Sequence, residues 1–152
     1  MVIIGIVLSF AVLSLNGDSH ELEDEARRLQ ALITLTGQEA VLQSKELAMQ
    51  FSDDGYEFEG YDGAKWQPLE NDETLRRRTL PDDLVLDYRA EGDRMTLGTD
   101  KDKKVPPRIY FLSSGEVSPF ELSLHRRGES ETYTLTGDVR GKTELKGPDD
   151  GR

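Results

Sequence analysis

The stretch Met1-Val-Ile-Ile-Gly-Ile-Val-Leu-Ser-Phe-Ala-Val-Leu-Ser-Leu15 carries no charge, and acidic and basic residues begin soon after it. These fifteen residues are fewer than the roughly 20 with which a helix crosses a bilayer. They are also too uniformly apolar for a surface helix, which keeps one polar face. The stretch therefore fits the end of a buried helix, a secretion signal or part of a membrane helix.

A secretion signal has basic residues before its apolar stretch and a cleavage site of small residues after it. In this chain nothing basic precedes Val2, the first Lys or Arg is Arg27, and no A-x-A pattern follows Leu15. A partial membrane helix over residues 1–15 is therefore favoured. Its predicted membrane residues are Val2, Ile3, Ile4, Ile6, Val7, Leu8, Phe10, Val12, Leu13 and Leu15.

Apolar residues continue at helical spacing from Ser19 to about Phe51. They recur three, four or seven residues apart, which places them along one side of a helix. The predicted packing stripe consists of Leu22, Ala26, Leu29, Ile33, Ala40, Leu47 and Phe51. No proline interrupts this part of the chain. We therefore predict one long helix, in which an amphipathic segment at 16–52 continues the apolar segment at 1–15.

After Asp53-Asp54-Gly55, which is typical of a helix end, the apolar residues alternate with the period of β-strands. Segments containing Gly, Pro or Asp separate the alternating runs. The predicted strands are Tyr56–Tyr61, Ala64–Gln67, Leu84–Arg89, Met95–Leu97, Arg108–Leu112, Phe120–Leu124 and Tyr133–Leu135. We predict an antiparallel sheet domain over residues 53–146 and a flexible tail at 147–152.

The helix stripe has to be buried against another element, and the sheet is the available partner. The order of elements therefore predicts an α+β fold, in which a long N-terminal helix packs on an antiparallel β-sheet. The first fifteen residues are expected to project beyond the globular part.

All thirty Asp and Glu residues and all nineteen Lys and Arg residues follow residue 15, and the net charge is −11. A field of this sign repels nucleic-acid phosphates and anionic lipid headgroups. We therefore expect no nucleic-acid partner, and any contact with a membrane is expected to come from residues 1–15. Because there is no cysteine, disulfides, thiol nucleophiles and Cys-ligated metals are excluded.

Residues with catalytic potential occur without the partners that catalysis needs. His20 and His125 have no metal-ligand pattern around them, and both are expected to be exposed. Ser113-Ser114-Gly115 lacks the G-x-S-x-G spacing of a nucleophile elbow and is expected to form a turn. No D-x-D-x-D-G calcium loop is present in the sequence. We predict that the protein is not an enzyme and has no cofactor or metal site.

The chain has one basic run, Arg76-Arg77-Arg78. It either balances charge on a loop or binds an acidic neighbour in an assembly. Tyr56, Phe58 and Trp66 are expected to pack in the core or against a hairpin rather than to form a ligand site.

Several blocks of sequence occur in a characteristic order. They are Glu21-Leu-Glu-Asp-Glu-Ala-Arg-Arg-Leu29, Glu39-Ala-Val-Leu-Gln43, Asp54-Gly-Tyr-Glu-Phe58, Trp66-Gln-Pro-Leu69, Arg78-Thr-Leu-Pro81, Ile109-Tyr-Phe-Leu-Ser-Ser-Gly115-Glu-Val-Ser-Pro-Phe120 and Gly137-Asp-Val-Arg-Gly141. Together with the apolar start they cover most of residues 2–146. In order and content they resemble the type IV pilin-like family and, within it, the H-type minor pseudopilins of type II secretion systems.

The resemblance implies a structural subunit with a single helix in the bacterial inner membrane and a globular domain in the periplasm. It implies assembly with other major and minor pseudopilins into a pseudopilus that moves folded secreted proteins outward, with secreted proteins as further contacts. Neighbouring subunits are expected to bind in a groove between the long helix and the sheet edge.

Members of this family begin with a short basic leader, a Gly cleaved by prepilin peptidase and a start of the Phe-Thr-Leu-Ile-Glu type, which this sequence does not contain. The resemblance therefore implies that the start was placed too late and that residues 1–15 are the second half of a pilin-type membrane helix. Whether prepilin peptidase processes the protein stays open.

Two other functions are open to test. A minor pilin of a type IV pilus that takes up DNA needs basic residues clustered on one surface. From Phe120 to Arg152 the chain has six basic and seven acidic residues, which argues against it. A small secreted or anchored hydrolase would need a nucleophile–base pair or a metal site. The assembly subunit is favoured over both.

Overall fold

The computed structural model describes residues 2–90 and 106–149, and for residues 2–19 and Ala90 it describes the backbone alone. The first element, α1 (Val2–Gln43), is a helix of 42 residues. At about 1.5 Å per residue it is about 63 Å long. Within the described residues the strands are β1 (Leu47–Ser52), β2 (Gly55–Tyr61), β3 (Trp66–Pro68), β4 (Arg78–Thr79), β5 (Leu84–Ala90), β6 (Arg108–Phe111), β7 (Phe120–Arg126), β8 (Thr132–Gly137) and β9 (Thr143–Asp149).

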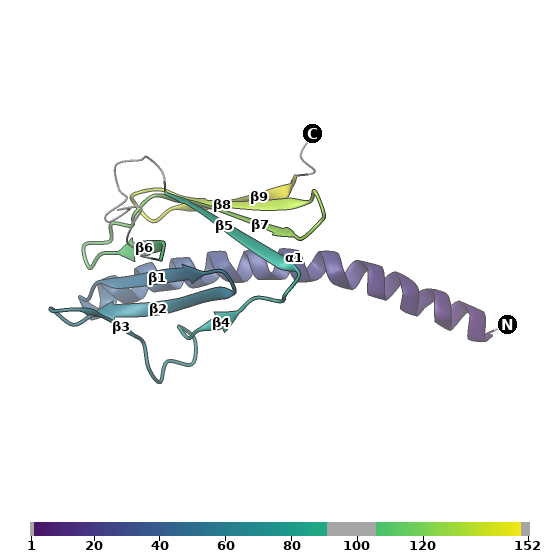
Figure 1. The fold of residues 1–152 in the computed structure, drawn as a ribbon, viewed down its shortest axis with the longest axis horizontal. Coiled ribbons are helices and arrows are strands. Elements are labelled where there is room, and N and C mark those ends of the chain that lie inside the picture. The colour runs from purple at the N-terminus through teal and green to yellow at the C-terminus, as the bar shows by residue number, and fades with distance from the viewer. Residues whose placement is uncertain (1, 91–105, 150–152) are drawn as a thin grey trace.

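The strands form two antiparallel sheets, which lie one above the other in Figure 1, while the N-terminal part of α1 extends well beyond both. Sheet A has the order β3-β2-β1-β6, with β4 also paired to β2, and sheet B has the order β5-β7-β8-β9. Helix α1 contacts strands of both sheets. The predicted α+β class is confirmed. Two sheets form where one was expected. Alternation in the sequence shows which side chains share a face of a strand, but it does not show which strands pair with each other.

The core lies between α1 and the inner faces of the two sheets. On α1, Leu22, Ala26, Leu29, Ile33 and Ala40 of the predicted stripe are buried. The strands contribute large buried side chains, which include Met49, Tyr56, Phe58, Ile109, Phe111, Phe120 and Leu122. These residues join into one hydrophobic cluster that contains parts of α1 and of both sheets.

Helix α1 ends earlier than predicted, at Gln43 rather than near residue 52. Ser44 has a φ of 50°, in the left-handed region, and this conformation ends the helix. Leu47 and Phe51 are buried, but they belong to β1 and not to the helix stripe. Being four residues apart, they fit either a helix or a strand, whereas the buried Met49 between them fits only the strand. The sheet domain therefore begins at Leu47.

The predicted tail at 147–152 is also partly wrong, because β9 continues to Asp149 and pairs with β8. The side chains of β9 are mostly exposed, and Pro148 is tolerated because β9 is an edge strand. The strand therefore has little apolar pattern to reveal it. The predicted strand Met95–Leu97 and residues 150–152 lie outside the described residues.

The two sheets are also joined directly to each other. The rings of Phe51 on β1 and Tyr88 on β5 stack with centroids 5.4 Å apart. The Tyr88 hydroxyl donates a hydrogen bond to the carbonyl oxygen of Arg108 on β6, at 3.0 Å. Burial raises the pKa of Tyr88, so the hydroxyl stays protonated and remains a donor. Sheet B therefore has a defined position relative to sheet A.

Candidate assembly surface

A groove runs along the last three turns of α1. The turn that joins β6 to β7 and the turn that joins β8 to β9 form its other side. Its volume is about 520 Å³. The lining residues are Ile33, Thr34, Gly37, Gln38, Val41, Leu42, Phe111, Gly115, Val117, Phe120, Arg140 and Gly141. The expected groove lies between the long helix and the sheet edge, whereas this cavity lies between the helix and two turns that join strands.

The end of α1 is tied to the β6–β7 turn by Glu46, which follows the helix. The Glu46 carboxylate accepts hydrogen bonds from the backbone N–H of Ser113, at 3.2 Å, and from the Ser113 hydroxyl, at 2.7 Å. These two hydrogen bonds lower the pKa of Glu46, because they favour the charged carboxylate. The helix end and the turn are therefore held together on either side of the groove.

The two turns that face α1 are bonded to each other through their backbones. Val117 donates to the carbonyl oxygen of Val139 at 3.0 Å, and within the β6–β7 segment Ser118 donates to the carbonyl oxygen of Tyr110 at 3.0 Å. Gly115, in the predicted Ser113-Ser114-Gly115 turn, has a φ of 93° and closes that turn by donating to Leu112 at 3.0 Å. Because a side chain at positive φ is strained, glycine is the favoured residue there.

Large apolar side chains around this groove are exposed. Among the described residues, the exposed large hydrophobic side chains are Val41 (47%), Leu42 (78%), Leu112 (38%) and Val139 (51%). Val41 and Leu42 line the groove, while Leu112 and Val139 belong to the two turns that form its other side. Exposed apolar side chains that gather around a groove mark it as a candidate site of interaction.

The groove differs in charge from the chain as a whole, which has a net charge of −11. Its lining contains no carboxylate, and Arg140 is the charged residue in it. Within the part of the chain that the structure describes, Arg140 takes part in no ion pair. A cation beside exposed apolar surface is thus free to bind a carboxylate of another molecule.

Farther along α1, a buried polar contact holds the helix against sheet A. Glu25 is 7% exposed, and its carboxylate accepts hydrogen bonds from the Tyr56 hydroxyl and from Arg28, both at 2.9 Å. Burial, followed by the Glu25 charge, raises the pKa of Tyr56. A protonated tyrosine can donate to the carboxylate, so the contact is satisfied at neutral pH.

Arg126 at the end of β7 holds α1 against sheet B. Its guanidinium forms an ion pair with Asp83 and lies 3.7 Å from Glu21 of α1 and 3.9 Å from Glu129. The Arg126 side chain is 11% exposed, whereas its three partners are about half exposed, from 47% to 55%. The helix is therefore attached to both sheets before it reaches the groove.

The predicted membrane residues lie on α1, but their side chains are outside the described part of the structure. In the region that the structure describes, no helix contains a segment apolar enough, over a sufficient length, to span a membrane. The assignment of residues 1–15 to a membrane helix stays a prediction.

The two histidines differ in exposure. His20 is exposed, as expected. His125 is instead half-buried on β7, and its Nδ1 lies 3.8 Å from Asp87 on the neighbouring strand β5. Cross-strand pairing, which the sequence does not reveal, brings these two side chains together. Across the described residues, no cluster of three or more His, Asp or Glu side chains is placed to hold a metal ion.

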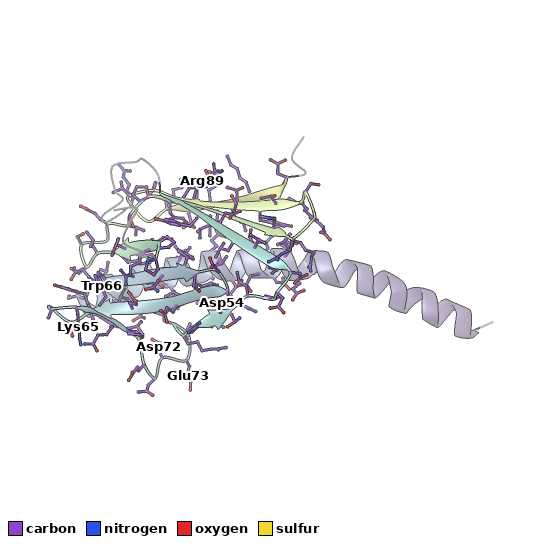
Figure 2. The ribbon with its side chains drawn as sticks, in the orientation of Figure 1. Asp54, Lys65, Trp66, Asp72, Glu73 and Arg89 are labelled. Carbon is purple, nitrogen blue, oxygen red and sulfur yellow. The ribbon has the colours of Figure 1, made fainter. Side chains whose placement is uncertain are left out.

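The aromatic residues pack as predicted. Tyr56 and Phe58 are buried in the core. Trp66 is half-buried at the β2–β3 hairpin, beside the labelled Lys65 in Figure 2, and its ring lies 5.3 Å from that of Tyr61 and 5.4 Å from that of Tyr110. The rings are tilted by 43° and 55°, so they form a packed cluster rather than a flat surface for a ligand.

The basic run Arg76-Arg77-Arg78 lies at the end of the loop that carries Asp72 and Glu73 in Figure 2. Arg77 lies 3.7 Å from Asp54, and Arg78 donates to the carbonyl oxygen of Thr74 at 3.1 Å. The Arg78 Nε is buried and has no hydrogen-bond partner among the described residues. The run is thus partly used in contacts within the chain.

Leu42, Leu112, Val139 and Arg140 were not singled out as candidate residues. Leu42 lies on the polar side of the helix pattern, and Val139-Arg140 lies in a turn. Isolated apolar residues on a surface carry no signal by themselves. Their common position becomes visible only when the end of α1 and the two turns are brought together.

Comparisons with known proteins agree on one family. A family model described as "Type II transport protein GspH" matches residues 25–141. The type II secretion system protein H of Pseudomonas aeruginosa is 36% identical over 149 residues, which cover 91% of this chain and 84% of that protein. The protein of the same name from Aeromonas hydrophila is 28% identical over 156 residues, covering 94% of this chain and 85% of that protein.

Solved structures show the same fold. The minor pseudopilin EpsH from the type II secretion system of Vibrio cholerae has a TM-score of 0.70 and 26% identity, covering 86% of this chain and 96% of that one. The type IV minor pilin FimU of Pseudomonas aeruginosa has a TM-score of 0.58 and 17% identity, covering 86% of this chain and 92% of that one. At that identity the likeness to FimU concerns the fold alone.

Proposed function

The chain belongs to the GspH family of type II transport proteins and is a minor pseudopilin, and we propose that it is built into a periplasmic pseudopilus by the packing of its long helix against other pseudopilins. In this role it takes part in the export of folded proteins. Its own contribution is packing and recognition, without bond chemistry.

The groove at the end of α1 is the observation that supports this proposal most strongly. It combines a long helix, the exposed apolar side chains of Val41 and Leu42, and an arginine without an ion pair among the described residues. A monomer would expose this surface to water at a cost of about 25 cal/mol per Å² of apolar area. A subunit that is covered by neighbours would bury it.

We propose that residues 2–15 belong to a single helix in the inner membrane and that the two sheets lie in the periplasm. The apolar composition of this segment supports the assignment, as does its position at the projecting end of α1 in Figure 1. The acidic globular domain is not attracted to anionic lipid headgroups, so the helix would provide the membrane contact.

A role in type IV pili is less well supported. The likeness to FimU is at 17% identity, and the mixed charge of the C-terminal region gives no basic surface for DNA. The type II assignment has a relative of 36% identity over most of the chain.

The proposal is tested by deleting the chromosomal gene and measuring secretion of exoproteins into the medium. We expect secretion to fall and to be restored by the gene on a plasmid, while pilus-dependent twitching and DNA uptake stay unchanged. Normal secretion together with lost twitching or DNA uptake would contradict the proposal and favour the pilus role.

A further inference from the structure

The free edge of β9 is a second surface that can bind another protein. We propose that this edge takes up an extended segment of a partner protein as an added antiparallel strand, and that the segment carries an acidic, an apolar and a basic residue in succession. The contact is separate from the groove at the end of α1 and involves no packing of long helices.

Strand β9 is an edge of sheet B and pairs with β8 on one side. Among the described residues, the backbone groups of residues 143–147 make no hydrogen bond beyond the pairing with β8. An open strand edge presents a row of N–H and C=O groups with which another chain can pair. Pro148 has no N–H, so the part of β9 that can pair ends before it.

The edges of sheet A do not offer the same row. Strand β6 is covered by the segment that follows it, because the Tyr110 N–H donates to the Ser118 hydroxyl at 2.7 Å and the Tyr110 carbonyl oxygen accepts from the Ser118 N–H at 3.0 Å. Strand β3, at the other edge, has three residues, and Pro68 is one of them. Strand β5, the other edge of sheet B, leads into residues outside the described part. The seven residues of β9 are therefore the better docking edge.

A groove beside β9 leaves room for the added strand. It has a volume of about 430 Å³ and is lined by Glu23, Arg27 and Gln30 on α1 and by residues of β9 that include Thr143 and Leu145. Gln30 donates a hydrogen bond to the Thr143 hydroxyl at 3.2 Å, which fixes the two walls relative to each other. Neighbouring strands lie about 4.8 Å apart, so a chain in this groove is within reach of the β9 backbone.

The side chains of β9 determine which segment fits. Glu144 and Lys146 are exposed on one face of the strand, and their charged atoms are 3.8 Å apart. Leu145, between them, points to the other face and is half-buried against the core. Opposite charges and apolar pairs stabilise side chains that lie directly across two antiparallel strands. The complement is an acid opposite Lys146, an apolar residue opposite Leu145 and a base opposite Glu144.

The direction of the partner follows from the same pairing. An antiparallel segment runs against β9, so its residue opposite Lys146 precedes its residue opposite Glu144, and the order is acid, apolar, base. Lysine and proline on an edge strand generally hinder the addition of another strand. Lys146 therefore acts against segments that lack the acid, which gives the edge specificity.

Strand β5 of this chain contains the same order of residues, Asp87-Tyr88-Arg89. Arg89, Glu121, Thr136 and Glu144 are successive cross-strand partners in sheet B, and Asp87 belongs to the row that ends at Lys146. A peptide with the β5 sequence, added antiparallel beyond β9, would place its arginine next to Glu144 and its aspartate next to Lys146. The sequence Leu84–Ala90 is therefore a suitable probe.

A whole second copy of the chain is not the partner in this proposal. Strands in a sheet are rotated by about 20–25° from one to the next, so the β5 of a second copy, four strands along, would be turned by about 80–100°. The long helices of the two copies would be turned by the same angle. They could then not both enter one membrane, as the proposed function requires, whereas a flexible segment meets no such restriction.

The first test measures binding of the peptide Leu-Val-Leu-Asp-Tyr-Arg-Ala, with a fluorescent label, to the purified full chain in detergent micelles. Fluorescence anisotropy is recorded with empty micelles as the blank. We expect saturable binding with a dissociation constant of about 100 µM or tighter. The peptide Leu-Val-Leu-Arg-Tyr-Asp-Ala, with the charges exchanged, should bind about tenfold more weakly. No saturable binding up to about 1 mM, or equal binding of both peptides, overturns the inference.

The second test asks whether the peptide binds as a strand. Two versions of the first peptide carry N-methyl groups at alternate residues, one set at even and the other at odd positions. A strand turns the N–H groups of alternate residues to the same side, so one set faces β9 and the other faces away. We expect one version to lose binding and the other to keep it. Loss in both versions, or in neither, contradicts strand addition.

The third test exchanges the charges on the protein. The double variant Glu144→Lys with Lys146→Glu should reverse the preference and bind the charge-exchanged peptide about tenfold better than the first. The control is Lys65→Glu with Glu73→Lys, two exposed residues on the sheet A side in Figure 2, and it should keep the original preference. An unchanged preference in the folded double variant refutes the pairing. If that variant does not fold, the two peptides on the unchanged chain decide the question.

These measurements use the purified chain and a peptide alone. Failure of the peptide to bind leaves the proposed role in secretion intact. Conversely, normal secretion after deletion of the gene contradicts that role and leaves strand docking at β9 standing.

Discussion

The Tyr56 hydroxyl on β2 donates a 2.9 Å hydrogen bond to the Glu25 carboxylate on α1, and both residues are buried. The contact joins the first buried turns of the helix to sheet A. Glu46 and Ser113 make a second polar contact near the other end of α1. Between these two contacts the helix stripe is covered, so the position of the groove follows from how both ends are fixed.

Tyr56→Phe removes the donor and leaves a buried carboxylate with one partner fewer. We expect the free energy of unfolding to fall by about 1–3 kcal/mol. Urea-induced unfolding followed by circular dichroism measures this change. Tyr61→Phe on the same strand is the matched control, because its hydroxyl makes no hydrogen bond recorded among the described residues. An equal loss in both variants would show that the contact with Glu25 does not stabilise the fold.

The same tyrosine gives the protein a pH dependence in the alkaline range. The pKa of Tyr56 is raised in the folded state, so above about pH 10 the unfolded chain loses the Tyr56 proton while the folded chain keeps it. Stability from this group is therefore present below pH 10 and is lost as the pH rises. Unfolding free energies at pH 8–11.5 should fall more steeply for the unchanged chain than for Tyr56→Phe, and parallel curves would refute this.

Ser113→Ala removes the hydroxyl hydrogen bond to Glu46 and keeps the bond from the backbone N–H, so it should weaken the contact between the end of α1 and the β6–β7 turn. The Ser113 hydrogen bonds lower the pKa of Glu46, so the stability they give is present at neutral pH and is lost as the pH falls through that lowered pKa. We expect Ser113→Ala to lower the melting temperature at pH 7 and to have a smaller effect near pH 3. Ser114→Ala serves as the control, and an effect of Ser113→Ala that does not change with pH would contradict the assignment.

Two glycines should respond in opposite ways to alanine. A Cβ at Gly137 would lie 2.1 Å from the Phe120 ring, so Gly137→Ala should cost about 1–3 kcal/mol through overpacking. A Cβ at Gly37 has ordinary contact distance, and Gly37→Ala should be neutral or stabilise α1 by up to about 1 kcal/mol. Thermal unfolding compares them. A stable Gly137→Ala variant would mean that Phe120 can leave its position over β8.

Periodic patterns in the sequence predicted much of the fold. The spacing of Leu22, Ala26 and Leu29 indicated a helix with one buried side, and alternation indicated most of the strands in the described residues. Periodicity did not predict where the helix ends, because the spacing of Leu47 and Phe51 fits both a helix and a strand. It did not predict β9 either, because an exposed edge strand needs no apolar alternation.

The candidate site was predicted beside the helix but not in its residues. A groove between the helix and the sheet edge was expected, and the structure has a groove along the helix with two turns on its other side. Its exposed members come from three separate segments, represented by Leu42, Leu112 and Val139. Each is unremarkable alone, and tertiary packing brings them together. Arg140 becomes a candidate binding residue because the groove lining contains no carboxylate. That lining can be seen in the structure but not in the sequence.

Co-purification of the tagged full chain with other pseudopilins from detergent-solubilised membranes tests the central claim most directly. The variant carries Leu42→Glu and Val139→Glu, and Val85→Glu on the outer face of sheet B is the control. The account predicts that the unchanged chain and Val85→Glu retain the pseudopilins, while the double variant is folded but loses them about tenfold or more. Equal retention by all three proteins would contradict assembly through this groove.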